Sequence, residues 1–206
     1  MIISIEGPDF VGKNSVIETL LIKAQEHLEN GYKVKVISFP NTETEIGRIC
    51  RQMLKKTTEW DTGTSSIFQL LNTAHRYEYW DLLKQAKQDP HLLLFIIRYN
   101  LSGPVYACVD GLDTTKTWQL YDWFNSVLPD ITFIIFRDFD FAKLPEERNP
   151  DHYETETKQE QVRRIYSLAP TLWPDKLGEA IFIENKNIEN TVEKIVAKLK
   201  KFLLNG

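Results

Sequence analysis

Two glycines and a lysine near the start of the chain have the spacing of a phosphate-binding loop. Residues 7–13 read Gly-Pro-Asp-Phe-Val-Gly-Lys, which is GxxxxGK, directly after the apolar residues 2–5. Glycines let the backbone curl so that amide N–H groups point at a phosphate, and the start of a following helix favours negative charge. The lysine supplies a mobile cation for the β- and γ-phosphates. The segment predicts a nucleotide site made by Gly7, Gly12, Lys13, Asn14 and Ser15.

One position of this loop departs from the usual P-loop pattern. The residue after Lys13 is normally Ser or Thr, whose hydroxyl ligates Mg²⁺, and here it is Asn14. An asparagine offers a carbonyl oxygen to the metal, or the metal is held through water. We expect Ser15 to face a phosphate, and Asn14 is the one metal ligand that the sequence proposes.

Apolar runs that alternate with amphipathic stretches must position this loop. The apolar runs fall at residues 2–5, 34–39, 92–97, 131–136 and 180–184, and the helical patterns at 14–29, 45–54, 66–87 and 188–204. Buried strands alternating with helices predict an α/β fold with a five-stranded, mostly parallel sheet flanked by helices. In such folds ligands bind at the carboxyl ends of the strands, where the glycine loop falls.

Composition excludes several other classes of protein. The chain has 206 residues, 42% hydrophobic, with 25 Lys and Arg against 29 Asp and Glu, a net charge of −4. This is an ordinary globular composition without the basic excess of a nucleic-acid coat. Its two cysteines, Cys50 and Cys108, lack the spacing of a zinc site or a disulfide framework, which favours a cytoplasmic protein. No apolar run is long enough to span a bilayer, so we expect no membrane partner.

Short motifs along the chain resemble those of one enzyme family. They are residues 5–13 (IEGPDFVGK), 39–47 (FPNTETEIG), 70–78 (LLNTAHRYE), 98–106 (RYNLSGPVY), 129–130 (PD) and 151–154 (DHYE). In this order and spacing they resemble the thymidylate kinases, P-loop nucleoside monophosphate kinases. The resemblance implies a P-loop NTPase fold in a single domain over residues 1–206, with a short lid at about 141–158. It also implies ATP and Mg²⁺, and transfer of the γ-phosphoryl group of ATP to a deoxynucleoside monophosphate, dTMP or a related or modified pyrimidine deoxynucleotide.

The resemblance assigns roles to particular residues. Lys13 would hold the transferring phosphoryl group, Arg98 would lie between donor and acceptor phosphates, and Asp9 would face the sugar and phosphate end of the acceptor. Arg76 would donate to a base carbonyl, Ser102 would lie near the pyrimidine, and Tyr106 would line the sugar pocket. Tyr153 and Glu154 would close over the nucleotide from the lid. The segment with Phe39 and Pro40 would line the acceptor site.

Four positions depart from the family pattern, and these departures concentrate where the acceptor and magnesium should bind. The family's Asp before Arg98 is Ile97, its acceptor-phosphate Arg is Thr42, its base-stacking aromatic is Asn72, and an Arg found in the P-loop of some members is Phe10. Other residues could compensate for three of these departures. Arg148 in the lid would replace the P-loop arginine, and Arg48 or Arg51 would bind the acceptor phosphate. Phe68 would supply the aromatic ring that is missing at Asn72. Asp110, Asp113, Arg163 and Arg164 are further candidates near the metal or the phosphates.

These departures leave alternatives open. Three interpretations remain: an active kinase with a reshaped acceptor pocket, a nucleotide-binding protein with little or no catalysis, and a deoxynucleoside kinase. The last needs a carboxylate base, and Glu43 and Glu45 follow the second strand. We expect small-molecule nucleotides as partners, no nucleic acid, and a homodimer formed through amphipathic stretches near residues 70–87.

Overall fold

The computed structural model describes residues 1–27, 31–55, 62–124, 127–144 and 150–205. Its centre is one sheet of five parallel strands in the order β2-β3-β1-β4-β5. The strands are β1 (Ile2–Glu6), β2 (Lys33–Ser38), β3 (Leu92–Ile97), β4 (Ile131–Phe136) and β5 (Glu179–Glu184). The five apolar runs are therefore confirmed as strands, and the α/β class is confirmed with them.

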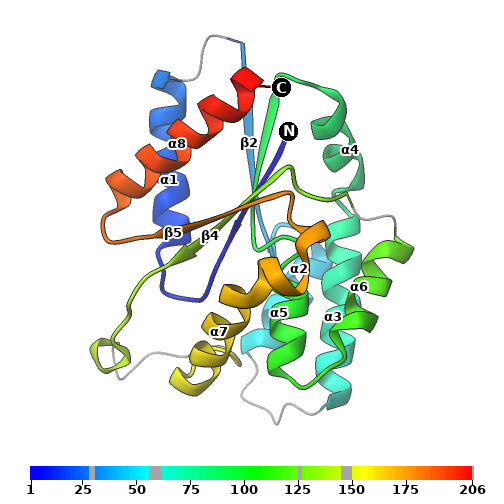
Figure 1. Ribbon diagram of the computed structural model, residues 1–206. Coiled ribbons are helices and arrows are strands. Elements are labelled where there is room, and N and C mark those ends of the chain that lie inside the picture. Colours follow the sequence, from blue (N-terminus) through cyan, green and yellow to red (C-terminus); the bar gives the residue numbers. More distant parts are fainter. Residues whose placement is uncertain (28–30, 56–61, 125–126, 145–149, 206) are drawn as a thin grey trace.

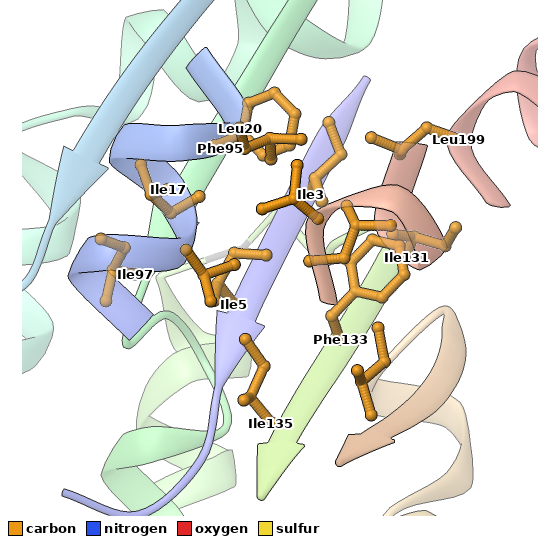
Figure 2. Close-up of a cluster of buried hydrophobic side chains, with 14 of the residues drawn as sticks. Ile3, Ile5, Ile17, Leu20, Phe95, Ile97, Ile131, Phe133, Ile135 and Leu199 are labelled. Atoms are coloured by element: carbon orange, nitrogen blue, oxygen red, sulfur yellow. The ribbon is translucent and has the colours of Figure 1, made fainter. Parts of the chain in front are cut away.

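Side chains alternate across the sheet because successive residues of a strand point to opposite faces. On β1, Ile3 and Ile5 pack with Phe95 and Phe133 of the neighbouring strands, as Figure 2 shows. The next residues, Ser4 and Glu6, belong to the opposite face. All of β3 is buried, which explains its unbroken apolar sequence.

Helices cover both faces of the sheet (Figure 1). On one face α1 (Lys13–His27) packs beside α8 (Ile188–Asn205), and both bury apolar side chains against the central strands. The remaining helices are α2 (Glu45–Lys55), α3 (Thr62–Tyr77), α4 (Trp80–Gln88), α5 (Ser102–Val109), α6 (Thr114–Trp123) and α7 (Glu156–Leu172). Two short 3₁₀ turns, η1 (Phe141–Lys143) and η2 (Pro174–Lys176), complete the described elements.

The helical pattern expected over residues 66–87 is two helices rather than one. The backbone turns at Glu78 and Tyr79, where the Tyr79 N–H bonds to the Arg76 carbonyl three residues back. The tighter bond ends α3, and α4 then packs against the sheet through Leu83 and Ala86. The apolar periodicity continues across the break because both helices bury one face.

The carboxyl ends of the strands open toward α2, α3, α5 and α7, which gather at one end of the sheet in Figure 1. The motif segments 5–13, 39–47, 70–78, 98–106 and 151–154 contribute residues to this end of the molecule, whereas residues 129–130 precede β4 at the opposite end of the sheet. None of the helices in the described ranges is long and apolar enough to cross a membrane.

Candidate active site

The loop after β1 needs glycine at two positions. Gly7 has φ +135°, and a Cβ there would lie 2.2 Å from the carbonyl oxygen of Ile135. Gly12 has φ +83°, and a Cβ there would lie 2.9 Å from the side-chain amide of Asn185. Other residues rarely adopt such angles, so both glycines of the motif are required by the shape of the loop.

Lys13 begins α1, and its ammonium group turns back into the loop. It donates to the carbonyl of Gly7 at 3.0 Å and also to the carbonyl of Pro8. Burial, and next the nearby charge of Arg98, lowers the pKa of Lys13 to about 7. Asp9 and Glu6 offset this lowering only in part, and a bound phosphate would add negative charge that favours the ammonium form.

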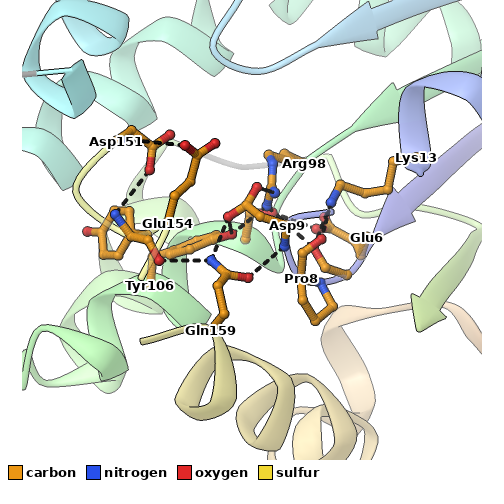
Figure 3. Close-up of polar contacts among 12 residues, drawn as sticks. Glu6, Pro8, Asp9, Lys13, Arg98, Tyr106, Asp151, Glu154 and Gln159 are labelled. Atoms are coloured by element: carbon orange, nitrogen blue, oxygen red, sulfur yellow. Dashed lines mark hydrogen bonds and ion pairs between the residues drawn. The ribbon is translucent and has the colours of Figure 1, made fainter. Parts of the chain in front are cut away.

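Asp9 lies at the centre of a charged network, shown in Figure 3. Its carboxylate pairs with Arg98 and accepts from the Tyr106 hydroxyl at 3.1 Å and from the Gln159 amide at 2.7 Å. Arg98 also donates to the Tyr106 hydroxyl at 2.7 Å. Burial opposes the charge on Asp9, but Arg98 and Lys13 outweigh it, so the pKa of Asp9 lies below its usual range. The network holds the Arg98 guanidinium beside the phosphate loop.

Gln159 is a member of this network that the sequence motifs do not indicate. Besides its bond to the Asp9 carboxylate, its side-chain oxygen accepts from the Asp9 backbone N–H at 2.7 Å. It is buried on α7 on the same face as Val162, Tyr166 and Ala169. A polar residue on an otherwise apolar helical stripe is the one sequence signal that would have found it.

Phe10 has a backbone that is unusual for a residue with a side chain. Its φ is +64°, and its ring stacks on Phe139 at 4.7 Å and meets the edge of Phe141 at 5.7 Å, between ring centroids. Arg98 has φ +61°. Such angles at non-glycine residues persist where surrounding contacts hold them, and they are common at functional sites.

Ser102 contacts a buried carboxylate. Its hydroxyl donates to Glu6 at 2.6 Å and lies 2.8 Å from the Tyr166 hydroxyl, which also donates to Glu6 at 3.1 Å. The Ser102 proton is therefore directed at Glu6, and the residue also lines the cavity described next.

One cavity of about 530 Å³ joins these groups to α2 and α3. It brings together the predicted residues Asp9, Gly12, Lys13, Asn14, Ser15, Phe39, Pro40, Phe68, Asn72, Arg76, Arg98, Ser102, Tyr106 and Tyr153. Phe10, Ser38, Thr42, Arg51, Leu54, Ile97, Asp151 and Glu154 also line it. Gly7 shapes the loop but does not line the cavity.

At the α3 end of the cavity Arg76 is buried, and most of its N–H groups donate to backbone carbonyls. Its two terminal nitrogens donate to the carbonyls of Asn72 at 2.9 Å, Arg98 at 3.2 Å and Tyr99 at 2.8 Å. Its Nε has no partner among the described residues. The guanidinium lies 5.3 Å from the Phe39 ring centre, so this end combines an aromatic wall with unused donors.

The two arginines proposed for the acceptor phosphate differ in position. Arg48 is exposed, donates to the carbonyls of Thr42 and Glu43 at 3.3 Å each, and does not line the cavity. Arg51, one turn later on α2, lines the cavity and lies 3.8 Å from Asp151. Arg148 falls outside the described residues.

The remaining candidates lie away from the cavity. Asp110 accepts from the Tyr153 hydroxyl at 2.5 Å and lies 3.2 Å from a His152 ring nitrogen. Asp113 caps α6 by accepting from the Thr115 N–H at 2.9 Å. Arg163 pairs with Asp138 at 2.7 Å on the surface, and Arg164 does not line the cavity either.

The donor set fits a magnesium ion only sparsely. Asn14, Ser15 and Ser38 bring neutral oxygens to the cavity, whereas Ile97 brings an aliphatic side chain. Among the described residues, no group of three or more His, Cys, Asp or Glu is arranged to hold a metal. Magnesium commonly keeps several waters and binds substrate phosphates together with one or two carboxylates, so these neutral oxygens fit that mode only in part.

Comparison with known proteins agrees with the motifs. The family model described as thymidylate kinase matches residues 5–195. The chain is 29% identical over 198 residues to the thymidylate kinase of Plasmodium falciparum, covering 95% of this chain and 89% of that protein. It is also 29% identical over 167 residues to the probable thymidylate kinase of Methanosphaera stadtmanae, covering 81% and 82%.

Solved structures share the fold. The thymidylate kinase of Candida albicans superposes with a TM-score of 0.70 at 20% identity, covering 97% of this chain and 91% of that one. The enzyme of Ehrlichia chaffeensis gives a TM-score of 0.68 at 22% identity, covering 97% and 98%. The P-loop NTPase fold is thereby confirmed, and with the family match it shows that this chain belongs to the thymidylate kinase family of nucleoside monophosphate kinases.

Proposed function

We propose that the protein transfers the γ-phosphoryl group of ATP to the 5′-phosphate of dTMP or a closely related pyrimidine deoxynucleotide. The observation that carries the proposal is that one cavity holds both Lys13 of the phosphate loop and Arg98 beside Asp9. Two phosphate-binding cations in one cavity suit a reaction whose donor and acceptor are both phosphates. The curated relatives named thymidylate kinase support the same acceptor.

Phosphoryl transfer requires little beyond positioning and charge stabilisation, and the residues of the phosphate loop suit that task. In this proposal the loop amides between Gly7 and Gly12 bind the phosphates of ATP, and Ser15 donates to one of them. Lys13 leaves the carbonyls of Gly7 and Pro8 and stabilises the charge on the transferring group. Arg98 contacts both phosphates with a planar guanidinium that Asp9 holds in place.

The acceptor would occupy the rest of the cavity. Asp9, Tyr106 and Tyr153 would contact its sugar, Arg51 its phosphate in place of the arginine missing at Thr42, and Arg76 a base carbonyl. The base would lie among Phe39, Pro40, Phe68, Asn72 and Ser102. Arg48 is less suited, because its guanidinium bonds to backbone on the surface.

Magnesium, when bound with ATP, would neutralise part of the phosphate charge. Asn14 would hold it directly or through water, with Ser15 close by. This chain's own contribution would be one neutral oxygen ligand, so most of the affinity would come from the phosphates.

Three broader features belong to the same proposal. Residues 1–206 would act as one domain, with a lid at about 141–158 that includes Tyr153. Exposed Ile49 on α2 and exposed Ile67 and Leu70 on α3 support a homodimer through these helices. The two free cysteines support a cytoplasmic location.

Two alternatives are weaker on specific grounds. A deoxynucleoside kinase would need a carboxylate base after β2, but Glu43 and Glu45 do not line the cavity. A nucleotide-binding protein without catalysis would not need the paired Arg98 and the buried Lys13, although the aliphatic Ile97 in the cavity favours it.

A coupled ADP-release assay with ATP and Mg²⁺ tests the proposal against both alternatives. The acceptors would be dTMP, 5-substituted pyrimidine deoxynucleotides, the other deoxynucleoside monophosphates and thymidine. We expect turnover with dTMP or a 5-substituted relative and none with thymidine. Turnover with thymidine alone would select the deoxynucleoside kinase, and a thermal shift with ATP but no turnover would select the binding protein.

A further inference from the structure

A side-chain amide faces the cavity from α3 without a protein partner. Asn72 is 6% exposed and lines the cavity, one helical turn before Arg76. Its backbone carbonyl accepts a bond from Arg76 at 2.9 Å. In the described part of the chain, no hydrogen bond to its side-chain oxygen or nitrogen is found. The amide is therefore both nearly enclosed and available to a ligand.

In the empty cavity water can bond to this amide, so the cost arises only when a ligand displaces that water. Asparagine offers two donors on Nδ2 and an acceptor on Oδ1, and leaving them without partners is unfavourable. A ligand that fills this end of the cavity avoids the cost only if its edge carries a donor and an acceptor. An apolar substituent alone would leave the amide unmet.

The neighbours of Asn72 restrict the ligand further. Phe39 and Phe68 present aromatic rings, which suit a flat ring system. Arg76 offers only donors, and its buried Nε lacks a partner among the described residues. A carbonyl oxygen on the ligand would satisfy Arg76, whereas an amino group would oppose it.

We propose that Asn72 selects the acceptor base by pairing with an imide edge, with Oδ1 accepting from the ring N–H and Nδ2 donating to an adjacent carbonyl. Resting on the proposed function, this makes Asn72 a specificity-determining residue that favours a base with a protonated ring nitrogen beside a carbonyl. Recognition would then depend on hydrogen bonds to the base edge and not only on packing against its ring.

Gln69 provides a matched comparison on the same helix. It is 4% exposed, and neither its side-chain oxygen nor its nitrogen has a partner among the described residues. It does not line the cavity; a Cβ at Gly103 would lie 3.3 Å from its oxygen, which places it against α5. Replacing it removes an equivalent buried amide away from the ligand.

The experiment measures the binding of dTMP and of N3-methyl-dTMP to three proteins by calorimetry. These are the wild type, Asn72→Leu and Gln69→Leu. Leucine keeps the branched shape of asparagine without its polar atoms, and at Gln69 it removes the amide with a side chain one carbon shorter. N3-methyl-dTMP keeps both carbonyls and the 5-methyl group but lacks the ring N–H. We expect the wild type and Gln69→Leu to bind dTMP about tenfold or more tightly than the methylated nucleotide. Asn72→Leu should bind dTMP about tenfold more weakly and show little preference between the two.

Each outcome decides the inference separately from the reaction. Equal binding of both nucleotides by the wild type would overturn it, even if Asn72→Leu failed to fold. A preference that survives in Asn72→Leu, or that is lost equally in Gln69→Leu, would also overturn it. A wild type that prefers dTMP but releases no ADP would contradict the proposed function while supporting the base selection by Asn72.

Discussion

The two ends of the cavity are built differently. At the phosphate end, Lys13 bonds to two carbonyls, and Asp9, Arg98, Tyr106 and Gln159 bond to one another. At the opposite end, the side chain of Asn72 and the Nε of Arg76 have no partners in the described ranges.

The difference follows from what each end must do. Phosphates are the same in every nucleotide, so charges that stabilise transfer are best fixed before binding. A base differs between nucleotides, and polar groups that the protein leaves without partners must be bonded by the base that displaces water from them, so the fit of the base becomes a condition for binding. The departures from the family pattern at Thr42 and Asn72 lie on the acceptor side, whereas Lys13, Asp9 and Arg98 keep the pattern.

The largest effect should come from Lys13, whose ammonium group stabilises the charge on the transferring group in the proposal. Lys13→Ala should lower kcat by about 1,000-fold, because a preorganised charge on the transition state is lost. Steady-state kinetics measure this loss, and circular dichroism should show an unchanged fold. Activity within tenfold of the wild type would contradict the role of the loop.

The second effect concerns Asp9, which fixes Arg98. Asp9→Asn should lower the unfolding free energy at neutral pH by about 3 kcal/mol, because the half-buried Arg98 is left without its counter-ion. Since the pKa of Asp9 is lowered in the fold, its stabilisation is present above its unfolded pKa and is lost as pH falls through the folded value.

Urea unfolding at neutral and acidic pH measures this difference. The gap between the wild type and Asp9→Asn should narrow below about pH 4. Asp138→Asn removes an exposed ion pair with Arg163 and is the control, with an expected change under about 1 kcal/mol. A gap that does not change with pH would show that Asp9 is not the charged partner of Arg98.

The third effect separates two arginines of α2. Arg51→Ala should raise the KM for dTMP about tenfold and leave the KM for ATP unchanged, because only the acceptor phosphate loses a charged hydrogen bond. Arg48→Ala should change neither, since Arg48 does not line the cavity. Equal effects of the two variants would mean that the acceptor phosphate is held elsewhere.

The smallest effect is the pH dependence of ATP binding. A pKa of about 7 leaves Lys13 partly neutral in the empty site, and ATP should raise this pKa and take up a proton. The affinity should therefore fall above pH 7, by about fivefold between pH 7 and pH 8. Calorimetry in two buffers measures the proton uptake, which should vanish in Lys13→Arg. Uptake that persists in that variant would assign the proton to another group.

The sequence was sufficient to predict structure where the residues involved are contiguous in the chain. The run from β1 through Gly7 and Gly12 to Lys13 is contiguous, so its spacing alone predicted both the loop and the strand before it. The wholly apolar β3 predicted a central strand in the same way. The prediction of a single helix over residues 66–87 was wrong. The turn at Tyr79 does not interrupt the apolar stripe, so the sequence pattern gives no sign that one helix ends and another begins there.

Contacts between distant segments could not be read from spacing. Gln159 bonds to Asp9 across 150 positions, and no motif marks that pairing. Arg48 and Arg51 share a helix, and only the way α2 packs decides which of them reaches the cavity. Ser102 was expected near the base, but its hydroxyl proton is directed at Glu6, a partner 96 positions away.

Following the terminal phosphate of ATP tests the central claim most directly. The protein is mixed with ATP radiolabelled in the γ-phosphate and with dTMP, and the products are separated by chromatography. The account predicts that the label appears in dTDP with the wild type and not with Lys13→Ala. Label that remains in ATP, or that is released only as inorganic phosphate, would contradict phosphoryl transfer to the nucleotide.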